Sequence, residues 1–310
     1  MTIKHIFFTS IITIFISSCG NNAQKENYYG GIAKLSVDES FKHLIDAQLQ
    51  MFTSENPTTL ILENYKQEQD CVKEFLEDSV QCIVIGRALN DLEKEEILKK
   101  KQTINVKLLG YDGVAIILNK ANQDTNFTLK QLEAIFNGQI AKWEDINPAS
   151  QLDSIIVVMD HSNSSNTYYV KQKFIPSTPF LNNVYAQENN EAVLKYVENN
   201  PNAIGIIGSN WIFNKNDSTA MLFLDKIKIA SLETQKNKEE AGAFCKPYQA
   251  YIALDAYPLK RSIYFINKGQ GGSGMGLGTF MMSQRGQLIL KKEGLLPYNT
   301  TVERSIKFSN

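Results

Sequence analysis

The stretch IIVVMDHSNSSNTYYVKQKF, from Ile155 to Phe174, places a strand pattern directly before a helix pattern. Its four leading β-branched residues predict a buried strand, and Tyr169, Val170 and Phe174 can share one face of a helix. Between the two patterns lie eight polar residues, DHSNSSNT, without glycine or proline. Strand and helix patterns alternate in this way along most of the chain. This alternation predicts an α/β fold with largely parallel sheets.

Other segments follow the same alternation. AKLSVDESFKHLIDAQLQMF predicts a short strand and a helix, and Ser36 and Glu39 fit a capping box before that helix. INVKLLGYDGVAIILNK holds two strand-like runs joined at GYDG. TLKQLEAIFNG predicts a helix that is capped by Thr128 and ended by Gly138.

A glycine-rich segment near the C-terminus, GQGGSG from Gly269 to Gly274, matches the GxGxxG pattern of dinucleotide-binding loops. The pattern requires a second strand after the helix and an acidic residue in a strand about 20 residues further on, and the sequence offers neither. We therefore expect GGSGMGLG to be a mobile loop rather than a nucleotide site.

The N-terminus has the pattern of an export signal. Lys4 precedes an apolar run from Ile6 to Ile16, which is too short to span a membrane and has the length of a signal-peptide core. The run ends in ISSC, and an aliphatic residue followed by two small residues and Cys19 resembles the bacterial lipobox. We expect a lipoprotein signal peptide over 1–18, lipidation at Cys19, and a flexible tether over 19–31. The protein would then be lipid-anchored to a bacterial membrane in the periplasm or cell envelope; the alternative is an ordinary signal peptide with an incidental cysteine.

Composition argues against several classes of function. The 310 residues carry a formal net charge of −1 and no long basic run, so nucleic acid is not an expected partner. Apart from Cys19, the predicted lipidation site, the cysteines are Cys71, Cys82 and Cys245, an odd number in which the identity of any disulfide pair stays open. No CxxC or histidine-rich spacing suggests zinc, and we expect neither a metal nor a cofactor. With only His43 and His161 left and no GxSxG elbow, we do not expect an enzyme.

The polar turn DHSNSSNT is the first candidate binding element. Free N–H groups and the helix dipole make a strand-to-helix junction a ready anion site. The turn adds four side-chain donors and one carboxylate acceptor, namely Ser164, Ser165, Asn166, Thr167 and Asp160. An acceptor beside donors suits a ligand that carries its own proton, such as phosphate. The alternative is simple N-capping of a surface helix, for which any one serine suffices.

Two further positions are candidates for anion binding. VDESFK repeats the order of strand, polar turn and helix, with Ser40 and Phe41 in the first turn. IVIGRAL places Arg87 just past a buried strand, where a guanidinium can form a bidentate pair with a phosphate or a carboxylate. The alternatives are a capping box and nothing more at Ser40, and a surface salt bridge at Arg87.

Three longer stretches resemble a known family. They are DGVAIILNKANQDTNFTLKQLEAIFNGQIAKWEDI, YPLKRSIYFIN and SQRGQLILKKEGLLP. Over most of residues 32–300 the chain resembles the phosphate-binding proteins of ABC-type phosphate importers, within the type II periplasmic binding proteins. The resemblance implies a two-lobe α/β fold with hinge-connecting strands and an inter-lobe cleft that holds an anion. Lobe 1 would comprise 32–110 and 248–310, and lobe 2 would comprise 111–247.

The resemblance also places the candidate residues. DHSNSSNT lies at the second-lobe phosphate loop, where Ser165 and Thr167 keep the family's Ser and Thr. His161 stands at the family's Arg and Asn163 at its Asp, so the loop lacks that charged pair. The SF pair at 40–41 matches the first-lobe contact, which is usually Thr-Phe. GRALN lies where the family often has an acid that accepts the phosphate proton, and it offers Arg87 instead.

We therefore expect a lipid-anchored substrate-binding protein of an ABC transporter, which binds phosphate or a related small oxyanion and delivers it to an inner-membrane permease. Ser40 and the adjoining amides, including that of Phe41, would hold the ligand from lobe 1, and residues 164–167 would donate from lobe 2. Arg87 would supply the counter-charge, and Asp160 would accept a ligand proton. The alternative is a cell-envelope accessory lipoprotein with the same fold that binds no phosphate and has another protein as its partner.

Overall fold

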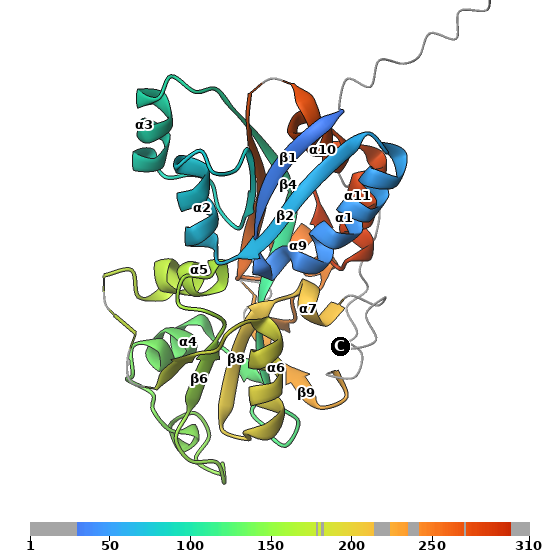
Figure 1. Cartoon of the computed structure of the whole chain (residues 1–310). Coiled ribbons are helices and arrows are strands. Elements are labelled where there is room, and N and C mark those ends of the chain that lie inside the picture. Colours follow the sequence, from blue (N-terminus) through green and yellow to red (C-terminus); the bar gives the residue numbers. More distant parts are fainter. Residues whose placement is uncertain are drawn as a thin grey trace, which may run out of the picture.

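The structure is a computed structural model that describes residues 30–177, 179–180, 183–213, 224–234, 242–269 and 271–298. The predicted signal peptide, Cys19 and all but the last two residues of the predicted tether lie outside these ranges. Figure 1 shows the chain as two groups of helices and strands, one above the other, with a common sheet running between them.

The sheet has the strand order β2-β1-β3-β12-β4-β8-β6-β7, and β9 and β13 also pair with β4. Its first half contains β1 (Gly31–Asp38), β2 (Thr59–Lys66), β3 (Cys82–Ile85), β12 (Lys260–Lys268), β13 (Leu296–Pro297) and the beginning of β4 (Ile104–Asn119). Its second half contains the end of β4, β6 (Ile156–Met159), β7 (Val184–Ala186), β8 (Ala203–Gly208) and β9 (Ile227–Ile229). A three-stranded sheet joins β5 (Asn126–Phe127), β10 (Ser231–Glu233) and β11 (Phe244–Cys245).

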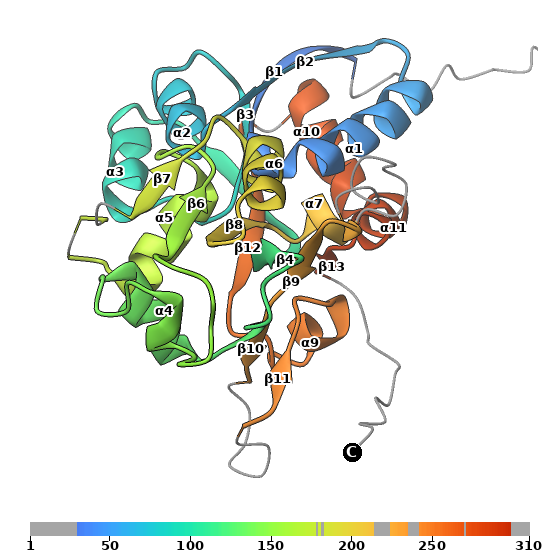
Figure 2. The same ribbon diagram turned by 90° about the horizontal axis from the view of Figure 1, so that it is seen from below.

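Within each half the outer strands run parallel, as the alternation predicts, whereas β4 and β12 are antiparallel to each other and to their outer neighbours. Figure 2 shows β4 and β12 in the middle of the molecule, between the two halves. Because these two long strands link the halves, side chains near their crossing can reach elements of both. The lobe boundaries at residues 110/111 and 247/248 stay a prediction.

Helices pack on both faces of each half. In the first half, α1 (Lys42–Glu55), α10 (Gly272–Met282) and α11 (Gln284–Lys292) lie on one face, and α2 (Glu68–Leu76) and α3 (Asp91–Lys99) on the other. Successive residues of β3 alternate between these faces, with Val84 in the α1 core and Ile83 and Ile85 in the α2 core.

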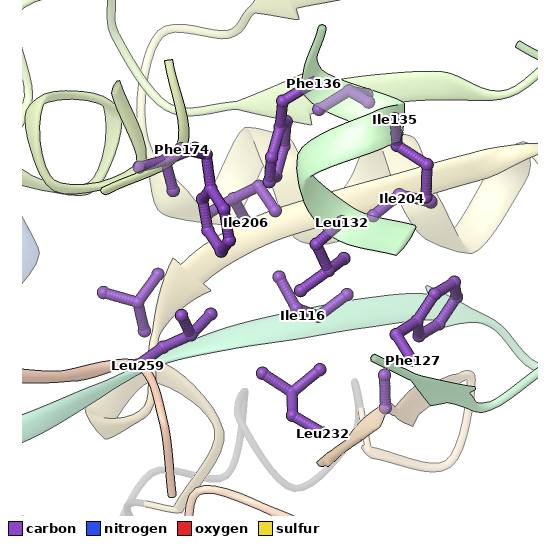
Figure 3. Close-up of a cluster of buried hydrophobic side chains, with 14 of the residues drawn as sticks. Ile116, Phe127, Leu132, Ile135, Phe136, Phe174, Ile204, Ile206, Leu232 and Leu259 are labelled. Atoms are coloured by element: carbon purple, nitrogen blue, oxygen red, sulfur yellow. The ribbon is translucent and has the colours of Figure 1, made fainter. Parts of the chain in front are cut away.

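The second half repeats this layering. α4 (Leu129–Phe136) and α5 (Ser165–Phe174) cover one face, and α6 (Asn190–Asn199) and α7 (Asn210–Phe213) the other. Figure 3 shows Ile116 of β4 among Leu132, Phe136 and Phe174 of the covering helices. The predicted start and end of α4 are confirmed, because Thr128 caps it in a reciprocal capping box and Gly138 follows with φ +74°. The short elements are η1 (Glu39–Phe41), η2 (Trp143–Asp145) and α9 (Gln249–Ala253).

The prediction of two strands joined at GYDG is wrong, because β4 runs through this segment without interruption. The glycines permit close packing rather than a turn. A Cβ on Gly110 would lie 2.3 Å from the Leu296 carbonyl oxygen, and one on Gly113 would lie 2.8 Å from the Pro247 Cβ. One strand of 16 residues therefore passes from the first half of the sheet to the second.

The prediction of a mobile loop at GGSGMGLG is also wrong, because this segment forms most of helix α10. Its glycines bring the helix axis close to the sheet. A Cβ on Gly274 would lie 2.5 Å from the Cys82 Sγ, and one on Gly278 would lie 2.5 Å from the Phe265 Cε1. Glycine has a low helix propensity, but this helix packs so closely on the sheet that no side chain fits at these positions. The packing therefore determines the local structure here.

Two further features concern membrane-spanning helices and disulfide bonds. No helix within the described ranges is long and apolar enough to cross a membrane. The sequence left a disulfide open, and in the structure Cys71, Cys82 and Cys245 are all buried free thiols.

Candidate ligand-binding site

Two strand-to-helix junctions meet between the halves of the sheet. One is the junction of β1 and η1, which carries Ser40, and the other is the junction of β6 and α5, which carries Asp160, Ser165 and Asn166. The Ser40 Oγ lies 3.4 Å from the Ser165 Oγ, 3.3 Å from the Asn166 Nδ2 and 3.5 Å from the Asp160 Oδ2. Four of the predicted residues, from segments about 120 positions apart, thus form one buried polar cluster.

The first junction is shaped by Asp38 rather than by the predicted capping box. The Ser40 N–H donates to the Asp38 Oδ1 at 3.2 Å, which makes Asp38 the cap of η1. Ser36 lies inside β1 and donates its hydroxyl to Glu74 of α2 instead, so its assignment as the cap is wrong. The Phe41 side chain is fully buried in the α1 core, and only its backbone remains available for the predicted contact.

The second junction divides its donors between two tasks. Ser164 caps α5 by accepting from the Thr167 N–H at 3.1 Å, and the Thr167 hydroxyl donates to the His161 carbonyl at 3.0 Å. These two hydroxyls stabilise the turn. For Ser164 this is the helix-capping role that the sequence analysis gave as the alternative to ligand binding. Ser165 and Asn166 instead point across to Ser40.

Asp160 is the acceptor on which the cluster converges. Its Oδ1 accepts from the Ser164 hydroxyl, and its Oδ2 accepts from the Asn166 Nδ2 at 2.9 Å and the Asn190 Nδ2 at 3.1 Å. Asn190 begins α6 and was not identified from sequence, where it reads only as a helix-start residue. The carboxylate is 1% exposed, and this set of amide and hydroxyl donors replaces the water it has lost.

The buried cation of the cluster is Arg261, which sequence reasoning missed. It lies on β12 directly opposite Asp112 of β4, and its Nη2 donates to the Asp112 Oδ2 at 2.8 Å. Its Nη1 donates to the Ser165 Oγ at 2.6 Å, and the guanidinium lies 4.7 Å above the centre of the Phe41 ring. The available signal was an arginine inside the strand pattern LKRSIYFIN, since arginine is seldom fully buried without a partner.

Asp112 is held in turn by the second half of the sheet. The Ser209 hydroxyl and N–H donate to its Oδ1 at 2.6 and 3.1 Å, and the Gly113 N–H donates at 2.8 Å. This fixed carboxylate orients the Arg261 guanidinium toward Ser165.

Arg87 lies elsewhere than predicted. Its Nε donates to Glu68 at 3.0 Å, and both of its terminal nitrogens donate to Glu93 at 2.8 Å. Its contact with α5 is with the Tyr168 ring, 5.0 Å from the guanidinium carbon, and none of its hydrogen bonds within the described residues reaches the Ser164–Thr167 turn. Arg87 therefore belongs to a half-buried ion-pair network beside the cluster. This arrangement resembles the salt bridge that the sequence analysis gave as the alternative role of Arg87.

The two halves of the sheet contact each other directly around the cluster. The Ser40 carbonyl accepts from the Asn210 Nδ2 at 2.8 Å and the Trp211 Nε1 at 3.1 Å. The Asn190 Nδ2 also donates to Glu39 at 2.8 Å. These bonds from α6 and α7 to η1 join the two halves of the sheet around the cluster.

Burial raises the pKa values of the carboxyls in and beside the cluster. It raises the pKa of Asp160 to about 7 against the opposing hydrogen bond from Ser164, and that of Glu39 to about 7 against the bond from Asn190. It also raises the pKa of Glu68 to about 7, with the charge of Asp38 adding to the effect. These carboxyls therefore gain and lose their protons near neutral pH rather than in their usual range near pH 4. Within the described residues, no group of three or more His, Cys, Asp or Glu side chains could hold a metal ion.

These raised pKa values predict a protein that is more stable in mild acid. Between the usual carboxyl pKa of about 4 and the native value of about 7, the native state binds more protons than the unfolded state, so the free energy of unfolding falls as pH rises. Groups with lowered pKa values, such as Asp78, titrate below this range. In phosphate-free buffer, circular dichroism should show a melting temperature several degrees higher at about pH 5 than at about pH 8. Glu39→Gln should reduce this difference, and a melting temperature that increases with pH would contradict the prediction.

Comparison with known proteins agrees with this geometry. The model of a PBP superfamily domain matches residues 22–285. The phosphate-binding protein PstS of Staphylococcus saprophyticus is 21% identical over 284 residues, which are 89% of this chain and 83% of that protein. The relatives are binding proteins by name, in agreement with the prediction that this chain is not an enzyme.

Solved structures show the same fold. A protein proposed to be the substrate-binding protein of a phosphate ABC transporter in Clostridium perfringens, solved with bound phosphate, has a TM-score of 0.71 at 19% identity, and the match covers 87% of this chain and all of that one. An ABC-type phosphate transport receptor from Vibrio cholerae has a TM-score of 0.65 at 18% identity, over 86% of this chain and all of that one. The predicted two-lobe, type II periplasmic-binding-protein fold is thereby confirmed, and the chain belongs to the PBP superfamily.

Proposed function

We propose that this protein is the lipid-anchored substrate-binding protein of an ABC transporter and binds phosphate between two lobes, comprising 32–110 with 248–310 and 111–247. The observation that supports this most is the convergence of Ser40, Ser165 and Arg261 on one buried site between the halves of the sheet. The names of the relatives point to the same ligand and the same transport system.

Each residue of the cluster has a role in this proposal. Ser40 and the backbone amide of Phe41 donate from lobe 1, and Ser165 and Asn166 donate from lobe 2. Arg261 supplies the counter-charge that we first expected from Arg87, while Ser164 and Thr167 shape the turn. Asp160, in its ionised form, accepts a hydrogen bond from an O–H group of the ligand. The lobes open and close about β4 and β12, and the ligand passes to a membrane permease.

The lipid anchor rests on the ISSC pattern at residues 16–19. If Cys19 carries the lipid, Cys19→Ala should release the protein from the membrane fraction of cells that otherwise retain it. Retention of Cys19→Ala in the membrane fraction would exclude this anchor.

Calorimetric titration with phosphate tests the binding function, using the Cys19→Ala protein. We expect micromolar or tighter binding that is weakened about 10- to 100-fold in Ser165→Ala, because a hydrogen bond to a charged group contributes roughly 1.5–3 kcal/mol. Ser54→Ala is the matched control, since the Ser54 hydroxyl is exposed and donates to its own helix. Equal affinities for the two variants would remove Ser165 from the site.

The accessory lipoprotein is retained as a second candidate because of one observation. Asp160 already accepts from Ser164, Asn166 and Asn190, so the protein's own carboxylate uses donors that a bound anion would need. Absence of heat with millimolar phosphate and sulfate, from a folded protein, would favour this candidate.

A further inference from the structure

Carboxylates outnumber cations around the candidate site. Ser40 donates to both Asp38 and Asp160, and the Asn190 Nδ2 donates to both Glu39 and Asp160, so these three carboxyls are neighbours. The Glu68 carboxylate lies beside them, because a Cβ on Gly86 would be 3.2 Å from the Glu68 Oε2 and 3.0 Å from the Ser165 Cβ. These four carboxyls come from β1, η1, the start of α2 and the end of β6. Arg261 is the cation that faces them from β12, and Asp112 of β4 already binds one of its nitrogens.

The remaining charged and titratable groups do not reverse this balance. Arg87 lies beyond Glu68 and is shared with Glu93. The Tyr169 hydroxyl on α5 donates to the Lys260 carbonyl, and the His43 ring on α1 stacks edge-on against Trp211. Above neutral pH these carboxyls lose their protons, so a second negative charge on a ligand would meet several buried carboxylates with one partly neutralised guanidinium to offset them. The free energy of that arrangement is large and unfavourable at low dielectric.

The unsatisfied polar atoms of the site point to the same conclusion. The buried atoms without a hydrogen-bond partner include two carboxamide acceptors, the Asn166 Oδ1 and the Asn210 Oδ1, and one donor, the Arg261 Nε. The two carboxamides are held in this orientation because their nitrogens already donate, from Asn166 to Asp160 and Ser40 and from Asn210 to the Ser40 carbonyl. Since buried acceptors are normally satisfied, a ligand suited to this site brings O–H groups.

We propose that the site selects phosphate in its monobasic, doubly protonated form, so that affinity falls as the solution becomes alkaline. This inference rests on the proposed phosphate-binding function. Monobasic phosphate carries one charge and two O–H donors, which suit the orphaned acceptors of Asn166 and Asn210. Dibasic phosphate has one O–H donor and a second charge, and sulfate has no O–H donor. The burial that raises the pKa of Asp38 favours the same proton-rich state.

Calorimetric titration of the Cys19→Ala protein with inorganic phosphate, from about pH 5.5 to about pH 8.5 at constant ionic strength, tests the proposal. Inorganic phosphate loses its second proton near neutral pH. The dissociation constant should therefore increase at least about tenfold for each pH unit above neutrality, because the ligand proton, and any proton that a site carboxyl loses in this range, is linked to binding. Titrations in two buffers of different ionisation enthalpy should show net proton uptake on the alkaline side. Sulfate should not bind at any of these pH values.

Three results would overturn the inference in distinguishable ways. An affinity that is constant or increases toward alkaline pH would show that the dibasic form binds, while phosphate binding itself would stand. Sulfate binding with comparable affinity would show that ligand protons are not recognised. Absence of phosphate binding across the whole pH range, from a protein that circular dichroism shows to be folded, would remove the proposed function and the inference together.

Glu39→Gln removes one carboxylate at the edge of the site and should reduce the loss of affinity at alkaline pH.

Discussion

Replacing Arg261 with glutamine should abolish phosphate binding and reduce the free energy of unfolding by about 3–5 kcal/mol. The side chain is 1% exposed and pairs with Asp112 at 2.8 Å, so its removal leaves a buried carboxylate without its cation. It also removes the donor that reaches the Ser165 hydroxyl. Calorimetric titration measures the first effect, and urea denaturation followed by circular dichroism measures the second.

Three further arginine variants make this experiment specific. Arg285→Gln removes an exposed guanidinium that pairs with Glu55 far from the cluster, and should change neither binding nor stability appreciably. Arg261→Lys keeps the charge without the planar fork and should fold, yet bind phosphate at least about tenfold more weakly. If Arg261→Lys bound phosphate with the affinity of the unaltered protein, Arg261 would have no role in recognising the ligand. Arg87→Gln should weaken binding much less than Arg261→Gln, and the reverse order would restore our first assignment of the counter-charge.

Replacing Gly274 with alanine should destabilise the protein by about 1–3 kcal/mol, although alanine is the better helix former. The added Cβ would lie 2.5 Å from the Cys82 Sγ, which is packed against the sheet and cannot move far. Gly271→Ala is the matched control, because Gly271 has open space around its Cβ position and an extended φ of −162°. Thermal and urea denaturation measure both variants.

The cause of this effect can be isolated with a double-mutant cycle. Cys82→Ala alone should destabilise the protein, since it leaves a gap in the core. In the double variant Gly274→Ala, Cys82→Ala, the new methyl group occupies the space left by the sulfur. The double variant should therefore be more stable than the sum of the single effects predicts, by at least about 1 kcal/mol. Strict additivity would show that contact with Cys82 is not the reason for glycine at position 274.

Local patterns allowed much of the fold to be predicted, because hydrophobic spacing and caps depend on neighbours in sequence. Thr128 and its helix are one such case, and the strand before Asp160 is another. The strand through GYDG and the helix through Gly274 could not be predicted in this way. In both, glycine is required by an atom of a distant segment, the Leu296 carbonyl in one case and the Cys82 sulfur in the other.

The candidate site shows the same division. Asp160 and Ser165 were identified because the turn that carries them is polar from end to end. Arg261 and Asp112 are 149 positions apart, and only the register of β12 against β4 makes them partners. Arg87 was favoured because it ends a strand, and neither Glu68 nor Glu93 could be recognised in advance as the group that binds it.

The position of Arg261 on a connecting strand has a consequence for the order of events during capture. Ser40 and Ser165 are carried by opposite halves of the sheet, so they would separate in the opening motion that we propose. Arg261 is anchored to β4 through Asp112, at the axis about which the halves would turn, and so it stays in place. An anion that enters the open protein would meet this stationary cation first, and the hydroxyls would arrive second. Capture would then begin with a charge-guided encounter whose rate falls with ionic strength, followed by a closing step that does not depend on salt.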